Sequence, residues 1–522
     1  MPTEPEPTPS IPARLLVALT GFATILLAAC APQAVRPAPA ATAAAAVGAP
    51  WLERVTYGLN STALSEFRRL GRTGFLDAQL DERPALLPAA IERQIEGLEI
   101  THADPARLLE EVNAESKRIN SLPDGADKEQ ARKALNDRGN RFAYEAARRH
   151  LLRAIYSPAQ LREQMDWFWL NHFSVHQYKA NLRWLVADYD EHAIRPHVFG
   201  RFRDLVMATL THPAMLQYLD NGQNAVGHIN ENYARELMEL HTVGVDGGYS
   251  QADVQALARI LTGVGINAGG PAPKLKPEWQ PLYRRAGAFE FNPARHDFGE
   301  KRFLGRAIEG RGFAEVEQAV DLLVRQPACA RFVSRRIALF FVSDDPPPRL
   351  VERMASTFET TGGEIGAVLR TLLASPEFEA SLGTKFKDPT HYVVAALRLA
   401  YDGRTIVNAH PLVNWLNALG EPLWGRQTPD GYPLTEGGWA SSGQISRRFE
   451  IAKAIANGSA GLFEPEDGSG AAMGGFPQLA SRVYYDAFEP RLSAPTRGAL
   501  ERAASQVEWN TFLLASPEFN YR

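Results

Sequence analysis

Cysteine is almost absent from this chain, which has only Cys30 and Cys329 in 522 residues. Two cysteines exclude a disulfide-rich scaffold and a zinc site built from four thiolates. Neither sign of charge is in excess, because 56 Lys and Arg stand against 60 Asp and Glu, for a net charge of -4. That balance gives no reason to expect a nucleic-acid partner. With 45% hydrophobic residues, the composition also excludes a disordered chain and a protein that spans a membrane many times.

Several sequence motifs of cofactor-dependent and nucleophilic enzymes are also missing. The chain has no GxGxxG in a strand-to-helix context, no Walker A sequence, no GxSxG elbow and no CxxC pair. These absences argue against a dinucleotide cofactor, P-loop hydrolysis, the α/β-hydrolase route and thiol redox chemistry. We therefore expect no cofactor.

The N-terminus has an export signal. An uncharged apolar run at 15–29 ends in Leu-Ala-Ala-Cys, with the cysteine at position 30. The run is too short for a membrane-spanning helix, which needs ~20 apolar residues, but it fits the hydrophobic part of a signal peptide over 1–29. Leu-Ala-Ala-Cys resembles the lipobox of bacterial lipoproteins, in which the cysteine is lipidated. A plain signal peptide or a short buried helix are the alternatives.

Residues 30–50 predict a tether between this anchor and the folded protein. They are rich in Ala and Pro and lack large apolar side chains, as in a linker outside any core. Ala31, rather than Asp, follows Cys30, as is usual in lipoproteins of the outer membrane. We therefore expect a lipid-anchored protein of the outer membrane, facing the periplasm or the cell surface, with the anchor as its membrane contact.

Helical periodicity dominates from Trp51 onward. Apolar residues three and four apart predict helices at 105–120, 128–155, 158–178, 230–242, 250–262, 313–326, 327–342, 350–360, 365–375, 388–401, 446–457 and 497–515. Residues 286–292 give one short candidate strand. The sequence predicts a mostly α-helical globular protein with long Gly/Pro-rich loops and little strand. A Gly/Pro-rich break at 263–285 divides it into helical halves at 51–270 and 271–522, and a similar loop covers 420–445.

The most informative segment begins at Asn230 and reads NENYARELMELH. Within this predicted helix, four side chains lie at i, i+3, i+4 and i+7 and share one face: Asn232, Arg235, Glu236 and Glu239. Two carboxylates one turn apart can push their pKa values apart, which creates a proton donor and a proton acceptor. This predicts Glu236 as a catalytic acid and Glu239 as a base or nucleophile, with Arg235, Asn232 and the terminal His241 binding substrate. A solvated helix face would show the same mixture of residues.

Two further clusters carry candidate residues. In DWFWLNHFSVH, His172 and His176 are four apart and would share a helix face, so they could chelate a metal. A hydrogen-bonded core histidine is the commoner explanation, so we expect no metal and assign Asn171 and His172 to substrate binding. The loop RHDFGEK at 295–301 offers Asp297 as a partner carboxylate, with His296 and Lys301 as binding residues. Asp166 is a second candidate partner.

These segments closely resemble the bacterial domain of unknown function 1800 family. The similarity rests on ENYARELMELHTVGVDGGYSQADV, FWLNHFSV and RHDFGEKRFLG, and covers about 51–519. The chain departs from the family where it has Val264 in place of the usual Trp, and His176 is not a constant feature. The resemblance implies export and a possible sulfatase-like partner protein, but no reaction.

Three functions remain open at this point. The first is an enzyme that cleaves an envelope or extracellular polysaccharide, with one carboxyl group as proton donor and another as base or nucleophile. The second is a non-catalytic assembly or carrier lipoprotein. In it the polar stripe formed by Asn232, Arg235, Glu236 and Glu239 is an internal network of hydrogen bonds and ion pairs. The third is a metal-dependent hydrolase centred on His172, His176 and Glu239.

Overall fold

The computed structural model describes residues 48–522 except 82, 84–85 and 470–475. The predicted signal peptide and Cys30 lie outside the described residues. Contacts divide the chain into residues 1–35 and 36–522, and the second unit contains everything described here. The predicted tether is too long at its end, because residues 48–55 are helical and Ala49 is fully buried. The division into halves at residue 270 stays a prediction.

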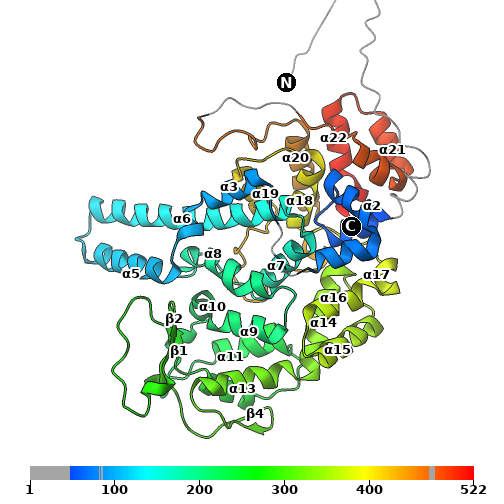
Figure 1. The fold of residues 1–522 in the computed structure, drawn as a ribbon. Helices are drawn as coiled ribbons and strands as arrows, with labels where there is room; N and C mark the ends of the chain where they lie inside the picture. Colours follow the sequence, from blue (N-terminus) through cyan, green and yellow to red (C-terminus); the bar gives the residue numbers. More distant parts are fainter. Residues whose placement is uncertain (1–47, 82, 84–85, 470–475) are drawn as a thin grey trace, which may run out of the picture. The chain divides into compact units, whose positions relative to one another are not determined.

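The unit is mostly helical, as the periodicity predicted (Figure 1). The longer helices are α2 (Ser61–Gln79), α3 (Ala89–Glu96), α5 (Pro105–Ser121), α6 (Ala126–Tyr156), α7 (Gln160–His172), α9 (Phe202–Thr211), α12 (Gln251–Ile260), α13 (Phe313–Val324), α14 (Pro327–Phe341), α15 (Pro348–Thr361), α16 (Ile365–Leu373), α18 (Pro389–Ala400), α19 (His410–Ala418), α20 (Ser442–Ala456), α21 (Ala494–Glu501) and α22 (Gln506–Ala515). Shorter ones are α4 (Glu99–His102), α8 (Val186–Asp188), α10 (Pro213–Tyr218), α11 (Asn232–Glu236), α17 (Pro376–Ala380) and α23 (Pro517–Asn520).

Strands are few and short among the described residues. β3 (Phe289–Phe291) lies between β1 (Val264–Ile266) and β2 (Arg284–Ala286), antiparallel to both, so the candidate strand at 286–292 is confirmed in position. β4 (Arg302–Phe303) and β5 (Arg306–Ala307) form a separate hairpin. None of the described helices is both long enough and apolar enough to cross a membrane.

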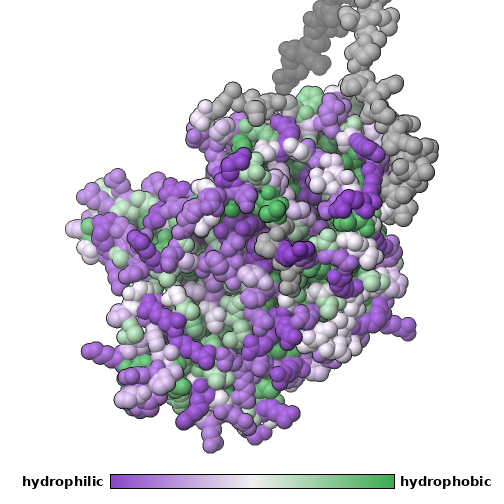
Figure 2. All heavy atoms as spheres, viewed as in Figure 1, coloured by the Kyte–Doolittle hydropathy of each residue, from purple (hydrophilic) through white to green (hydrophobic). Residues whose placement is uncertain are grey.

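The main hydrophobic cluster joins the described helices from Ala49 to Phe519 other than α3, whose Ile91 and Ile95 form a small second cluster with Leu152. The first described segment meets the C-terminal residue inside the main cluster, since Arg54 donates to the carbonyl oxygen of Arg522, and Figure 1 shows the blue and red segments side by side. Cys329 is a buried residue of this core. Hydrophilic residues dominate the face drawn in Figure 2, and the exposed large apolar side chains include Leu86, Tyr178 and Val245.

Two predicted helices end or break earlier than their periodicity suggested. α7 stops at His172, because Phe173 leaves the helical region (φ -101°, ψ 52°). The stretch at 497–515 forms two helices, since Ser505 caps the start of α22 by accepting a hydrogen bond from the Glu508 N–H.

The helix that carries the polar stripe changes its winding halfway. α11 (Asn232–Glu236) continues directly into the π-helical turn η5 (Leu237–Thr242). There the Val243 N–H bonds to the Met238 carbonyl oxygen at 3.0 Å, and the Thr242 hydroxyl bonds to the Leu237 carbonyl oxygen at 2.6 Å. Such turns are uncommon and occur often at functional sites.

Two other π-helical turns among the described residues are η2 (Tyr189–Ile194) and η9 (Tyr484–Phe488). Short 3₁₀ turns are η1 (Leu182–Trp184), η3 (Arg195–His197), η4 (Asn221–Gln223), η6 (Gln280–Leu282), η7 (Pro293–Arg295), η8 (Glu436–Gly438) and η10 (Glu489–Arg491).

Candidate functional site

The polar stripe lies at the surface of α11 and η5, while the opposite face of the helix is buried. Arg235 forms ion pairs with Glu231 at 3.0 Å and with Glu239 at 3.5 Å, and these side chains keep 37%, 33% and 26% of their area exposed. The amide of Asn232 donates to the Leu219 carbonyl oxygen. Glu236 is half-buried. Both stripe carboxylates are therefore within reach of solvent.

The C-terminus of α7 connects this helix to a distant loop. His172 Nε2 lies 2.9 Å from the backbone oxygen of His241, at the end of η5. The neighbouring Asn171 donates to the Tyr432 carbonyl oxygen at 3.0 Å and accepts from the Tyr432 N–H at 2.6 Å. At Gly431 (φ 73°), a Cβ atom would lie 2.2 Å from the backbone oxygen of Asn171, so the close approach requires glycine. Asn171 and His172 thus fix the position of other elements.

The loop that Asn171 holds brings a third carboxylate to the stripe. Asp430 accepts hydrogen bonds from Arg426 at 3.1 and 2.7 Å and from Thr428 at 2.5 Å. Its negative charge acts to raise the pKa values of Glu236 and of Tyr218. The Tyr218 hydroxyl donates to the Gln427 carbonyl oxygen of the same loop. We refer to Glu236, Glu239 and Asp430 as the carboxylate cluster.

Two members of the carboxylate cluster have pKa values shifted in opposite directions. Burial, and then the negative charges of Glu239 and Asp430, raise the pKa of Glu236, against the opposing effect of Arg235. Burial also acts to raise the pKa of Asp430, but the hydrogen bonds from Arg426 and Thr428 outweigh it, and its pKa is lowered. Glu236 is the better proton donor of the two, and Asp430 stays ionised.

Behind the carboxylate cluster lie two buried histidines and an arginine. Burial and the charge of Arg336 lower the pKa of His241 to about 3 and hold that of His172 well below its usual range. Both rings are therefore neutral. Burial lowers the pKa of Arg336 to about 10, against the charge of Asp430, which acts to raise it, so Arg336 is cationic at neutral pH. His241 is fully buried, so it supports the helix from behind.

The residues of the RHDFGEK loop are bonded to neighbouring helices. Asp297 pairs with Arg259 of α12 at 2.7 Å, and this bond lowers the Asp297 pKa, outweighing the burial that acts to raise it. His296 Nε2 and Lys301 Nζ lie 3.2 and 2.7 Å from the Glu315 carboxylate, with His296 and Lys301 almost fully buried. This loop packs on α12 and α13. The charged residues that shift the pKa of Glu236 are Glu239, Arg235 and Asp430, and none of these three belongs to the loop.

The geometry assumed for a chelating His172/His176 pair is wrong. α7 ends at His172, and His176 follows in a turn, so the two residues do not share a helix face. Among the described residues, the set of side chains spaced for a metal ion is instead His150, Asp166 and Asp190. We call this set the buried triad.

The buried triad joins three elements: α6, α7 and η2. His150 Nδ1 lies 3.5 Å from Asp190 Oδ2 and 3.7 Å from Asp166 Oδ2, and all three side chains are at most 1% exposed. Arg195 donates to Asp166 at 2.9 Å and to Glu163 at 2.6 Å. Burial and the charge of Asp190 raise the pKa of Asp166 far above its usual range.

Sequence reasoning missed Asp430, Arg336 and His150. Asp430 belongs to the Gly/Pro-rich loop at 420–445, whose length was a signal of function. Arg336 and His150 lie within ordinary amphipathic helices, where nothing in the local pattern distinguishes them.

No curated protein and no solved structure matches the chain. A family model does match, over residues 50–521, and its description reads "Protein of unknown function (DUF1800)". Because this match covers nearly the whole chain, including all the segments described above, the protein belongs to the DUF1800 family.

Proposed function

We propose that the protein is a hydrolase that cleaves an envelope or extracellular polysaccharide at the carboxylate cluster. The observation that carries this proposal is the opposite shift of two neighbouring carboxyl groups, upward at Glu236 and downward at Asp430. Two carboxyl groups with separated pKa values form an acid and a base, as glycoside cleavage requires.

In this mechanism Glu236 donates its proton to the oxygen of the leaving sugar. Asp430 either takes a proton from the attacking water or attacks the sugar carbon itself. Arg426 keeps Asp430 ionised through two hydrogen bonds. Asp430 suits this role better than Glu239, because it comes from a separate loop and can face Glu236 across a bound sugar. Glu239 then raises the pKa of the acid.

Arg235 and Asn232 would bind the substrate beside the acid. Arg235 has a partly exposed guanidinium that Glu231 and Glu239 hold in place. Asn171 and His172 act as positioning residues, since each bonds to backbone of the elements that carry the carboxylates.

The test is to incubate the purified protein with a panel of envelope and extracellular polysaccharides and to measure chain length and new reducing ends. We expect at least one polymer to be shortened, and Glu236→Gln to reduce the rate by ~10²–10⁴-fold. Glu352→Gln is the control, because Glu352 is an exposed glutamate on α15, outside the carboxylate cluster and its partners. If every polymer stays intact, a non-catalytic carrier or assembly lipoprotein is the better account.

We also propose that the chain is exported and anchored to the outer membrane through Cys30. The support is the apolar run and Leu-Ala-Ala-Cys at 27–30. Cys30→Ser should move the protein from the membrane fraction to the soluble fraction in its natural host. Unchanged partition between the two fractions would contradict the anchor.

A further inference from the structure

The buried triad has the spacing of ligands around a metal ion. Zinc binds imidazole nitrogen and carboxylate oxygen at ~2.0–2.2 Å, which places neighbouring ligand atoms roughly 3–3.5 Å apart. His150 Nδ1 lies 3.5 Å from Asp190 Oδ2 and 3.7 Å from Asp166 Oδ2. A cation among these three atoms would reach each of them with little movement of the side chains.

Buried polar atoms at the triad lack partners. Within the part of the chain that the structure describes, His150 Nε2 and the Oδ1 atoms of Asp166 and Asp190 are buried without a hydrogen bond, and His150 Nδ1 has only the Asp190 and Asp166 carboxylates, at 3.5 and 3.7 Å. A buried polar atom that nothing binds destabilises the fold. The indole nitrogen of Trp424, whose ring lies 6.2 Å from that of His150, is also buried without an acceptor. These atoms are available to an ion and to a water bound to it.

The local charge favours a divalent cation. Three carboxylates, Glu163, Asp166 and Asp190, surround the single guanidinium of Arg195, which bonds to the first two. If all are ionised, this group carries two negative charges in excess. Arg195 then holds the Asp166 carboxylate from outside, as partners of metal ligands commonly do.

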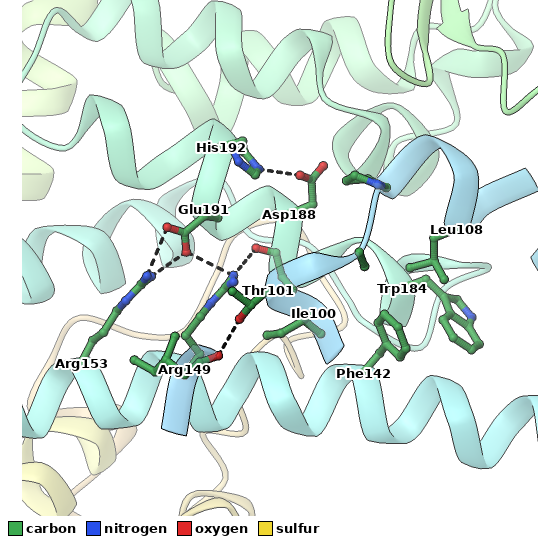
Figure 3. Close-up of a pocket in the computed structure, with 14 residues that line it drawn as sticks. Ile100, Thr101, Leu108, Phe142, Arg149, Arg153, Trp184, Asp188, Glu191 and His192 are labelled. Carbon is green, nitrogen blue, oxygen red and sulfur yellow. Dashed lines mark hydrogen bonds and ion pairs between the residues drawn. The ribbon is translucent and has the colours of Figure 1, made fainter. Parts of the chain in front are cut away.

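Two other arginines next to the triad share one carboxylate, so together with it they leave one positive charge, and the charge of Arg149 also acts on Asp190. Arg149 and Arg153 both pair with Glu191, at 3.4 and 2.6 Å. Figure 3 shows both guanidinium groups directed at this carboxylate. They line a cavity of about 180 Å³ between α6 and η2, beside Asp188 and His192. Arg149 and Glu191 immediately precede and follow the triad residues His150 and Asp190, but no triad side chain lines this cavity.

We propose that His150, Asp166 and Asp190 bind one divalent transition-metal ion. One imidazole and two carboxylates suit zinc, manganese or ferrous iron. The site is separate from the carboxylate cluster, so the proposal does not depend on the hydrolase function.

The test uses the full chain, purified without chelators. Elemental analysis should find about one zinc, manganese or iron ion per chain, and chelator-treated protein should take up one of these ions when each is added alone. His150→Gln and Asp190→Asn should lower the affinity by more than the ~10–100-fold that loss of an outer partner costs. His197→Gln is the control, because His197 is a half-buried histidine in the same region, on η3.

A second measurement keeps the proposal testable if the triad variants do not fold. X-ray absorption of the zinc-loaded wild-type protein should show one imidazole and oxygen ligands at ~2.0–2.2 Å. Folded wild-type protein that binds none of the three ions would overturn the proposal, and a proton shared between Asp166 and Asp190 would then account for the triad. Full metal content in folded His150→Gln and Asp190→Asn variants, or a spectrum without imidazole, would also overturn it.

Discussion

The carboxylate cluster and the buried triad contain the same kinds of side chain in opposite surroundings. Arg235 and Glu239 keep 37% and 26% of their side-chain area exposed, whereas every triad side chain is at most 1% exposed. In the carboxylate cluster, Asp430 and Glu239 have charged partners in Arg426 and Arg235. In the triad, several buried atoms have no partner. The carboxylate cluster is thus suited to acid/base chemistry on a large substrate, and the buried triad is suited to binding a small ligand such as a metal ion.

This contrast separates the expected effects of mutation. A charge removed at the surface changes chemistry and little else, because water replaces the lost partner. A charge removed in the interior leaves its partner buried and unpaired, which destabilises the fold. Glu236 and Arg195 are the residues at which the two cases differ most clearly.

The largest expected effect is on catalysis at the carboxylate cluster. Asp430→Asn should reduce hydrolysis by ~10²–10⁴-fold, as Glu236→Gln does, since both groups act in one step. The double variant should be little worse than either single variant, because residues that act as a unit are not additive. Rate measurements on the three variants check this. Losses that simply multiply would show that Asp430 and Glu236 act separately.

The next effect is on stability at the buried triad. Arg195→Gln leaves Glu163 and Asp166 without their cation in the interior, so it should lower the free energy of unfolding by ~3–5 kcal/mol. Urea unfolding measures this change. The control is Arg201→Gln: Arg201 pairs with Glu364 at 2.9 Å but is 59% exposed, so a loss below ~1 kcal/mol is expected. Equal losses in the two variants would erase the distinction between the regions.

A smaller effect concerns the pH dependence of stability behind the carboxylate cluster. Burial and Arg336 lower the pKa of His241 from 6.5 to about 3. The unfolded chain therefore binds a proton that the folded protein does not, and stability present above pH 6.5 is lost as the pH falls toward 3. His241→Phe should make this acid dependence shallower, and the variant of exposed His228, His228→Phe, should not. Unfolding curves at several pH values would contradict the account if both variants kept the wild-type slope.

The smallest expected effect is on stability at Glu236 itself. Its pKa is raised above 4.5, mainly by burial, so the folded protein holds this proton more tightly than the unfolded chain. The resulting stability is present below pH 4.5 and is lost as the pH rises through the raised pKa. Glu236→Gln should therefore be at least as stable as wild type at neutral pH. Melting temperatures at acidic and neutral pH check this, and a variant that unfolds at neutral pH would favour a structural network.

The sequence predicted the helices of this fold well, because their apolar stripes are local. The stripe of Asn232, Arg235, Glu236 and Glu239 was also found, since helical spacing alone brings these side chains together. Asp430 could not be found this way, because it belongs to a loop far along the chain, which Asn171 bonds at Tyr432. The charge of Asp430 acts to raise the pKa of Glu236.

The sequence pattern also could not predict where a helix changes its winding or which buried side chains lie next to one another. The apolar residues Phe173 and Val175 continue the periodicity of α7 past its true end at His172. The π-helical turn at Leu237–Thr242 depends on i to i-5 hydrogen bonds that no spacing of residue types reveals. His150 resembles any core histidine until Asp166 and Asp190 are seen beside it.

The pH profile of polysaccharide cleavage tests the central claim most directly. For a polymer that wild type shortens, kcat/KM should rise with the ionisation of Asp430 and fall as Glu236 loses its proton. These two limbs follow from an Asp430 pKa below 3.8 and a Glu236 pKa above 4.5. The account predicts a bell-shaped profile whose falling limb disappears, with most of the rate, in Glu236→Gln. Cleavage by Glu236→Gln at the wild-type rate, with the same profile, would contradict it.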